Sequence, residues 1–169
     1  MKTSDSLRPQ LRQISDLIDG IDYAMLTSRE SDGTLHTRPM KTEALQADGS
    51  LLFFTQASSA KAREIETNPQ VSISYMSGNA DVSVAVAGRA RLLRDPQKMK
   101  SLWKPLYKAW FPQGLEDPEL TLLAVTIERA EYWKTPANVP VRLLGAAKAI
   151  TTGEPAGTTG GEHERLQVL

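Results

Sequence analysis

The spacing of hydrophobic and polar positions predicts a helix at the start of the chain. Apolar residues recur there every three or four positions, which is the period of an amphipathic helix. They are Leu7, Leu11, Ile14, Leu17 and Ile18. Ser4 or Asp5 can cap this helix, and Gly20 can end it. Because Pro9 fits only the first turn of a helix, we expect the helix to begin near Ser6.

From Tyr23 onward the period changes to two, which is the spacing of half-buried β-strands. The predicted strands cover residues 23–27, 35–40, 42–45, 51–55, 71–76, 81–94 and 120–134. Pro39 predicts an edge or bulge position, because proline cannot donate a ladder hydrogen bond. Gly88 predicts a bulge or a barrel corner. A short helix is expected over residues 60–67, capped by Ser58 or Ser59, with further helical turns over residues 96–103 and 105–110.

This order of elements is typical of a small antiparallel barrel with helices packed outside it. Six or seven short strands follow one another, and the helices lie at the start, in the middle and at a crossover. The length of 169 residues fits one domain, which we place at residues 1–145. Beyond Thr135 the chain is rich in Pro, Ala, Gly and Thr. We therefore interpret residues 146–169 as a C-terminal tail that is partly flexible.

Composition and missing motifs exclude several classes of function. The chain has no cysteine, which removes disulfide frameworks, thiolate zinc sites, iron–sulfur clusters and cysteine nucleophiles. It has no glycine-rich phosphate loop and no Gly-x-Ser-x-Gly elbow. Its only histidines are His36 and His163, so we expect no metal site. No apolar run approaches about 18 residues and no signal-peptide pattern opens the chain. We expect a soluble, cytoplasmic protein.

The charge is balanced overall but unevenly distributed. Twenty Lys and Arg oppose twenty Asp and Glu, which argues against a dedicated nucleic-acid binder. Residues 88–110 nevertheless hold seven basic side chains and one acidic one. Four of the ten aromatic residues cluster at Trp103, Tyr107, Trp110 and Phe111. Such a segment can pack on the barrel, contact a planar anionic ligand or bind a nucleic-acid strand, and the residues alone leave these alternatives open.

Two further segments have the chemistry to bind an anion. Ser58, Ser59 and Lys61 lie at the start of the second predicted helix, where free N–H groups and the helix dipole favour negative charge. In the second segment Arg38, a forked donor suited to phosphate, precedes Pro39. The alternatives are a plain serine cap beside a solvated lysine, and an edge-strand arginine that meets solvent.

Together these segments resemble the FMN-binding split-barrel proteins related to pyridoxamine 5′-phosphate oxidase, and in particular their bacterial general stress branch. The resemblance is collinear over roughly residues 5–135 and rests on the order and spacing of its segments. The matching segments are residues 23–27, 36–40, 53–55, 58–61, 64–65, 68–71, 86–90, 103–114 and 130–133.

The resemblance implies a mainly β, six-stranded antiparallel split barrel that forms a homodimer with two FMN sites at the interface. Arg38 and Lys61 would hold the FMN phosphate, helped by Ser59. Trp110 and its neighbours would close over the flavin from the partner subunit. The isoalloxazine ring would be lined by Pro39, Met40, Phe54 and Thr55.

One departure from the family pattern bears on activity. True pyridoxamine phosphate oxidases follow the tryptophan of their final strand with an Arg-x-His pair. Here Trp133 is followed by Lys134, Thr135 and Pro136. The resemblance therefore favours a flavin-dependent oxidoreductase that passes a hydride or an electron pair to oxygen, a quinone or another small acceptor, and not the vitamin-forming enzyme.

Other functions stay open at this point. A flavin carrier or scavenger without turnover needs the same pocket. The basic segment over residues 88–110 offers a surface for an anionic partner, although we expect neither a nucleic acid nor a membrane. Split barrels also bind haem and deazaflavins, and His36 makes haem a further candidate cofactor. No residue pattern marks an acid, a base or a substrate pocket.

Overall fold

The computed structural model describes residues 8–78, 81–134 and 162–168. Its strands are β1 (Tyr23–Arg29), β2 (Leu35–Lys41), β3 (Ala44–Leu45), β4 (Ser50–Gln56), β5 (Gln70–Met76), β6 (Val82–Leu93), β7 (Leu120–Lys134) and β8 (Glu162–Gln167). Its helices are α1 (Pro9–Ile18), α2 (Ala60–Thr67) and α3 (Pro96–Leu102), with 3₁₀-helices η2 (Pro105–Ala109) and η3 (Gly114–Glu116). Apart from η3 and β8, each of these elements was predicted from the sequence.

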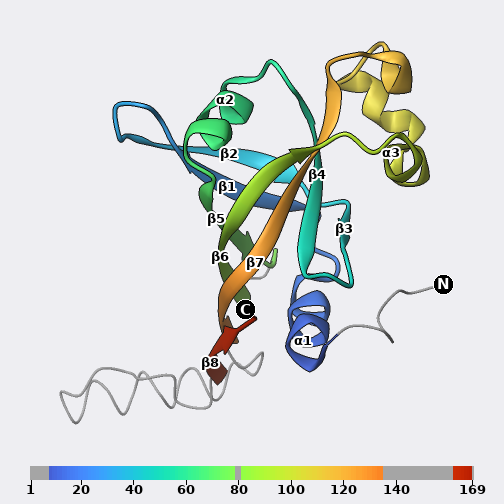
Figure 1. Ribbon diagram of the computed structural model, residues 1–169. Coiled ribbons are helices and arrows are strands. Elements are labelled where there is room, and N and C mark those ends of the chain that lie inside the picture. The colour runs from blue at the N-terminus through green and yellow to red at the C-terminus, as the bar shows by residue number, and fades with distance from the viewer. Residues whose placement is uncertain (1–7, 79–80, 135–161, 169) are drawn as a thin grey trace, which may run out of the picture.

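The strands form one antiparallel sheet that curls into a half-barrel with helices around it (Figure 1). Its order is β2-β1-β5-β6-β7-β4-β3, and β8 pairs with β7. Six strands of at least seven residues build the barrel, and the short β3 and β8 extend it. The mainly β, antiparallel split-barrel fold expected from the sequence is confirmed.

β4 is buried on both faces and separates two hydrophobic cores. Leu51 and Phe53 pack inside the barrel, where they meet α1 and the inward faces of the other strands. Leu52 and Phe54 alternate with them and pack into a second core, which includes Tyr107 of η2 and covers the outside of the barrel. Figure 1 shows this lobe, which contains α3, beside the ends of β4 and β7.

Gly88 lies at the point where β6 changes its register against β7. The pairing shifts by one residue between Ala87 and Gly88, which is the bulge that the sequence predicts. A Cβ atom on Gly88 would lie 2.3 Å from the carbonyl oxygen of Thr126. Only glycine lets the two backbones approach this closely, because any side chain would push the bulge apart.

The first helix begins later than its sequence pattern indicates. Residues 1–7, which include Ser4, Asp5, Ser6 and Leu7, lie outside the described residues. α1 starts at Pro9, and its N-cap residue Arg8 makes no side-chain capping bond. The expected start near Ser6, with a cap from Ser4 or Asp5, is therefore wrong. Proline has no N–H to satisfy and a fixed φ, so it suits the first helical position itself.

The C-terminal segment contributes a strand that the sequence analysis does not predict. β8 pairs antiparallel with the second half of β7, so residues 162–167 of the tail that was expected to be partly flexible form part of the sheet. Leu166 and Val168 are buried in the barrel core. The alternation is too short and too rich in charge to be read as a strand from sequence. Residues 135–161 lie outside the described residues, and the domain limit at residue 145 stays a prediction.

None of the helices in residues 8–78, 81–134 and 162–168 is long and apolar enough to cross a membrane.

Replacing Gly88 should destabilise the fold through the bulge. We expect Gly88→Ala to lower the free energy of unfolding by about 1–3 kcal/mol, because the new methyl group must displace backbone. Gly78→Ala is the matched control: a Cβ atom there meets nothing within 4 Å, so its effect should stay within about 0.5 kcal/mol. Urea denaturation of both variants measures the difference. Equal stabilities would refute the assignment of Gly88 as a packing-restricted position.

Candidate functional site

A cavity of about 210 Å³ lies on the outside of the barrel, between β2, β4, α2 and η2. Seven of the eight residues predicted for cofactor binding line it, and the eighth, Arg38, does not. The seven are Pro39, Met40, Phe54, Thr55, Ser59, Lys61 and Trp110. The remaining lining residues are Tyr23, Lys41, Glu43, Gln56, Tyr107 and Phe111. Residues far apart in sequence therefore meet at one concave surface.

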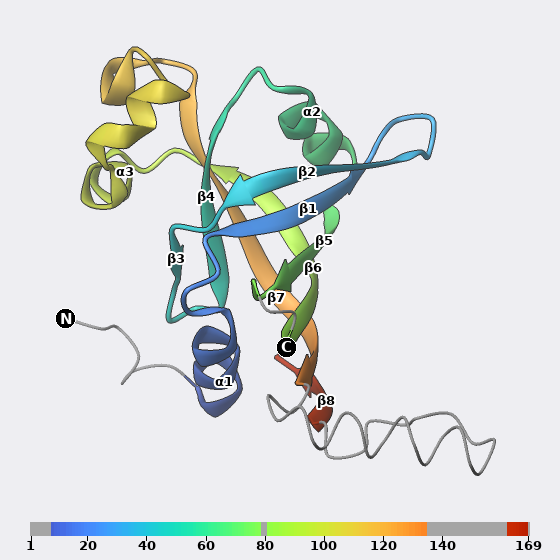
Figure 2. The same ribbon diagram turned by 180° about the vertical axis from the view of Figure 1, so that it is seen from behind.

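β2 supplies one wall of the cavity from the edge of the described sheet. It pairs only with β1, and Pro39 lies opposite Met25. This confirms the edge position that the sequence predicts for Pro39, where a missing N–H is tolerated. Figure 2 shows β2 and β1 side by side, with α2 next to them. Because successive residues of a strand point to opposite faces, Pro39 and Lys41 share the outer face.

The N-terminus of α2 forms the polar end of the cavity. The side chain of Ser59 caps the helix by accepting a hydrogen bond from the N–H of Ala62 at 3.4 Å. Lys61 Nζ donates to Thr55 Oγ1 at 3.2 Å, and the hydroxyls of Thr55 and Ser59 lie 3.4 Å apart. Three donors and the positive end of a helix dipole thus converge, which is an arrangement that favours an anion.

Among the described residues, no carboxylate forms an ion pair with the ammonium of Lys61. Burial lowers the pKa of Lys61, the positive charge of Arg38 lowers it further, and Glu64 opposes them only in part. A bound anion would favour the charged form of Lys61, because an opposite charge at short range stabilises it.

Arg38 lies on the opposite face of β2 from Pro39. Its guanidinium donates to Ser28 Oγ and, at 2.8 Å, to Glu64 Oε2. The Ser28 hydroxyl also donates to this carboxylate. Burial tends to raise the pKa of Glu64, but the bonds from Ser28 and Arg38 and the charge of Arg38 lower it on balance. Arg38 therefore acts from behind the strand, within electrostatic range of Lys61 but outside the cavity lining.

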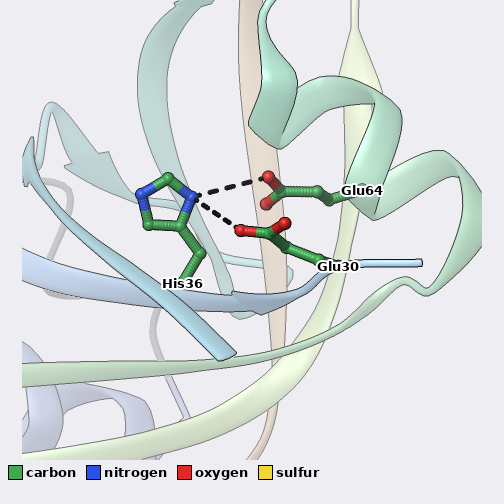
Figure 3. Close-up of side chains that lie close together, drawn as sticks. All are labelled: Glu30, His36 and Glu64. Atoms are coloured by element: carbon green, nitrogen blue, oxygen red, sulfur yellow. Dashed lines mark ion pairs between the residues drawn. The ribbon is translucent and has the colours of Figure 1, made fainter. Parts of the chain in front are cut away.

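A cluster of one histidine and two carboxylates lies beside this ion pair (Figure 3). His36 Nδ1 is 3.4 Å from Glu30 Oε1 and 3.7 Å from Glu64 Oε1. The ligand atoms come within 4.8 Å of one another, a proximity that the sequence analysis does not predict. Arg38 already places a positive charge on Glu64, which opposes a metal cation. The cluster joins the β1–β2 hairpin to α2.

Aromatic side chains form the wall that faces β2. Phe54 contacts Trp103 and Tyr107, each with ring centroids 5.6 Å apart, and Phe111 at 6.3 Å. Trp110 lines the cavity of its own subunit and is 56% exposed, whereas the resemblance implies that it closes over the flavin of the partner subunit. The basic, aromatic segment singled out by the sequence thus splits into the buried Tyr107 with the half-buried Trp103 and Phe111, which pack on Phe54 of β4, and Trp110 at the mouth of the cavity.

Glu43 is a polar lining residue that the sequence analysis missed, and its partner Tyr107 was singled out only as a member of the aromatic segment. The Tyr107 hydroxyl donates to Glu43 Oε2 at 2.5 Å. Burial raises the pKa of Glu43, although the Tyr107 bond, Lys104 and Lys41 lower it in part. No motif marks Glu43. The available signal was the alternation through Pro39 and Lys41, which continues to Glu43 on the same face.

Comparisons with known proteins match this fold to one family. Residues 9–156 match the family described as pyridoxamine 5′-phosphate oxidase like. The chain is 28% identical to general stress protein 26 of Bacillus subtilis, over 78% of this chain and 94% of that protein. It is 26% identical to protein bli-3 of Neurospora crassa, over 92% of this chain and 79% of that protein.

Solved structures show the same architecture. The general stress FMN/FAD binding protein of Xanthomonas citri superposes with a TM-score of 0.66 at 26% identity, over 75% of this chain and 89% of that one. General stress protein 26 of Bacillus anthracis superposes with a TM-score of 0.64 at 23% identity, over 74% of this chain and 94% of that one.

Proposed function

The chain belongs to the pyridoxamine 5′-phosphate oxidase-like family, alongside general stress proteins, and we propose that it is an FMN-binding oxidoreductase of the general stress type. The observation that carries the proposal is the cavity, which joins a half-buried lysine at a helix N-terminus to an aromatic wall. A ligand that joins a phosphate to a flat ring suits both parts of the cavity, because the phosphate matches the lysine and the helix N-terminus and the ring matches the aromatic wall. A relative whose structure is solved is named for FMN/FAD binding.

The polar end of the cavity fits the phosphate of FMN. Lys61 and Ser59, with the free N–H groups of α2, bind the phosphate oxygens. Arg38 adds positive charge from the other face of β2 while Glu64 and Ser28 hold its guanidinium in place. The anion supplies the negative charge that Lys61 lacks, so binding and the charged state of Lys61 reinforce each other.

The apolar part of the cavity fits the flavin ring. Pro39, Met40, Phe54 and Thr55 contact the ring, and Trp110 shields it from water at the mouth. Bound FMN supplies the two-electron chemistry, whereas the protein binds and orients it. The vitamin-forming reaction is not proposed, because the Arg-x-His pair that should follow Trp133 is missing from the sequence.

A homodimer would complete the site. On the outer face of β1, β5 and β6, two neighbouring rows of paired residues carry only uncharged and mostly small side chains. One row is Met25, Ser74 and Ala85, and the other is Thr27, Ser72 and Ala87. This face continues into the cavity through Tyr23 and Pro39, which lie in the same layer. A second copy of the chain seated on this face would cover the open side of the cavity.

Lys61→Ala tests the phosphate site. We expect FMN affinity to fall about 10- to 100-fold, since a hydrogen bond to a charged group is lost, while affinity for riboflavin, which has no phosphate, stays within about twofold. Quenching of flavin fluorescence measures both dissociation constants. Lys100→Ala removes an exposed lysine of α3 and should change neither. An equal loss for FMN and riboflavin would place the phosphate elsewhere.

A reduction assay separates the oxidoreductase from a flavin carrier. We expect NADH or NADPH to bleach the visible absorbance of the FMN-loaded protein in a stopped-flow experiment, and oxygen or a quinone to restore it. Free FMN at the same concentration is the control. Bleaching no faster than that of free FMN would favour the carrier, which needs the same cavity but no turnover.

Ser74→Arg tests the dimer face. We expect the variant to sediment as a monomer and to bind FMN more weakly than the wild type, because a guanidinium buried without a partner strongly opposes association. Gln10→Arg, at an exposed position of α1, should leave the dimer intact. Analytical ultracentrifugation measures both. A dimeric Ser74→Arg variant would mean that another surface forms the interface.

A further inference from the structure

Glu43 places a carboxylate in a cavity that we propose binds an anion. It follows β2, and its backbone N–H donates to the carbonyl of Leu52 at 2.8 Å. Thr55, at the polar end of the cavity, lies three residues further along β4, or roughly 10 Å in an extended strand. The carboxylate and the ammonium of Lys61 line the same cavity, but Glu43 is not among the charges that shift the pKa of Lys61, so the phosphate has no need to meet Glu43.

Only one oxygen of this carboxylate is used by the protein. Tyr107 donates to Oε2 at 2.5 Å, whereas Oε1 accepts no hydrogen bond from the part of the chain that the structure describes. Tyr107 is itself buried between Phe54 and Trp103, so its hydroxyl has little freedom to move. The result is a fixed carboxylate with one acceptor oxygen available to a ligand in the cavity.

The surrounding charges favour the ionised form of Glu43. Burial raises its pKa, while the Tyr107 bond, Lys104 and Lys41 lower it. Lys41 is paired with Asp22 at 2.8 Å, and Lys104 lies 5.9 Å from the centre of the Tyr107 ring. Tyr23 and Asp22 are the other titratable groups in electrostatic contact with Tyr107. Two cations and a hydroxyl donor thus face the carboxylate.

We propose that Glu43 is a ligand-recognition residue, whose Oε1 accepts a hydrogen bond from an N–H or O–H group of the flavin at the end remote from Lys61, and that Tyr107 positions it. This inference rests on the proposed function. The cavity then selects ligands with an anion at one end and a hydrogen-bond donor at the other.

The role of Glu43 predicts how binding depends on pH. Protonation neutralises the carboxylate and weakens it as a hydrogen-bond acceptor. The contribution of Glu43 to FMN affinity is therefore present above the pKa of Glu43 and is lost as the pH falls through that pKa. Because the pKa is raised, the loss begins at a higher pH than for an exposed glutamate. Removing the Tyr107 hydroxyl takes away a bond that lowers the pKa, so the loss should then begin at a still higher pH.

The experiment compares FMN dissociation constants of the wild type, Glu43→Gln and Tyr107→Phe across pH by fluorescence quenching. At neutral pH we expect Glu43→Gln to bind about tenfold more weakly, because a charged acceptor is replaced by a neutral one. The ratio of the two dissociation constants should fall towards one in acid. This ratio cancels the titration of the FMN phosphate. Glu66→Gln, at an exposed position of α2, is the matched control and should follow the wild type.

The Tyr107→Phe profile should move to higher pH, an effect that general loosening of the cavity does not produce. If Glu43→Gln fails to fold, this displacement alone tests the inference. Equal FMN affinity and equal pH profiles for the wild type and Glu43→Gln would overturn the role of Glu43 and leave the proposed function standing. A wild-type protein that binds no FMN would overturn both.

Discussion

The burial of β4 on both faces is the constraint on which the rest of the structure depends. Phe53 packs into the barrel, whereas its neighbour Phe54 packs under α3 and η2. Fully burying side chains of this size contributes about 1.5–3 kcal/mol each, so both cores hold β4 in place. The strand leads directly into Thr55 and the N-terminus of α2. The walls of the cavity are therefore set by two hydrophobic cores and not by loops.

The same arrangement explains why the cavity is electrostatically uneven. Lys61 and Glu43 are both partly removed from water, and burial opposes the charged form of each. They lie too far apart along β4 to neutralise each other directly, so each depends on closer partners. Glu43 has Tyr107, Lys41 and Lys104, but Lys61 has only the weak help of Glu64. A bound anion therefore gives the greatest electrostatic stabilisation at the α2 end of the cavity, beside Lys61.

Sequence patterns pointed to the polar end of the candidate site because this end is built locally. Thr55, Ser59 and Lys61 lie within one strand end and one helix start, where caps and dipoles follow from neighbouring residues. Arg38 was expected beside them in the cavity, but Ser28 and Glu64 hold its guanidinium outside the cavity lining. The register with β1 places Arg38 opposite the buried Leu26, on the face that it shares with Met40, so strand alternation alone does not separate Arg38 from the cavity. Glu64 is 26 positions away from Arg38 in the sequence, so no local pattern predicts this pairing.

The sequence by itself determined the elements, the antiparallel class, the bulge at Gly88 and the family, because these depend on local periodicity, glycine geometry and the order of short motifs. Only the tertiary structure decided which distant groups meet. Tyr107 and Glu43 are 64 positions apart, and β8 reaches β7 from beyond a long stretch of chain. Such contacts depend on sheet curvature and strand register. Both result from interactions throughout the fold, so they leave no pattern in any short stretch of residues.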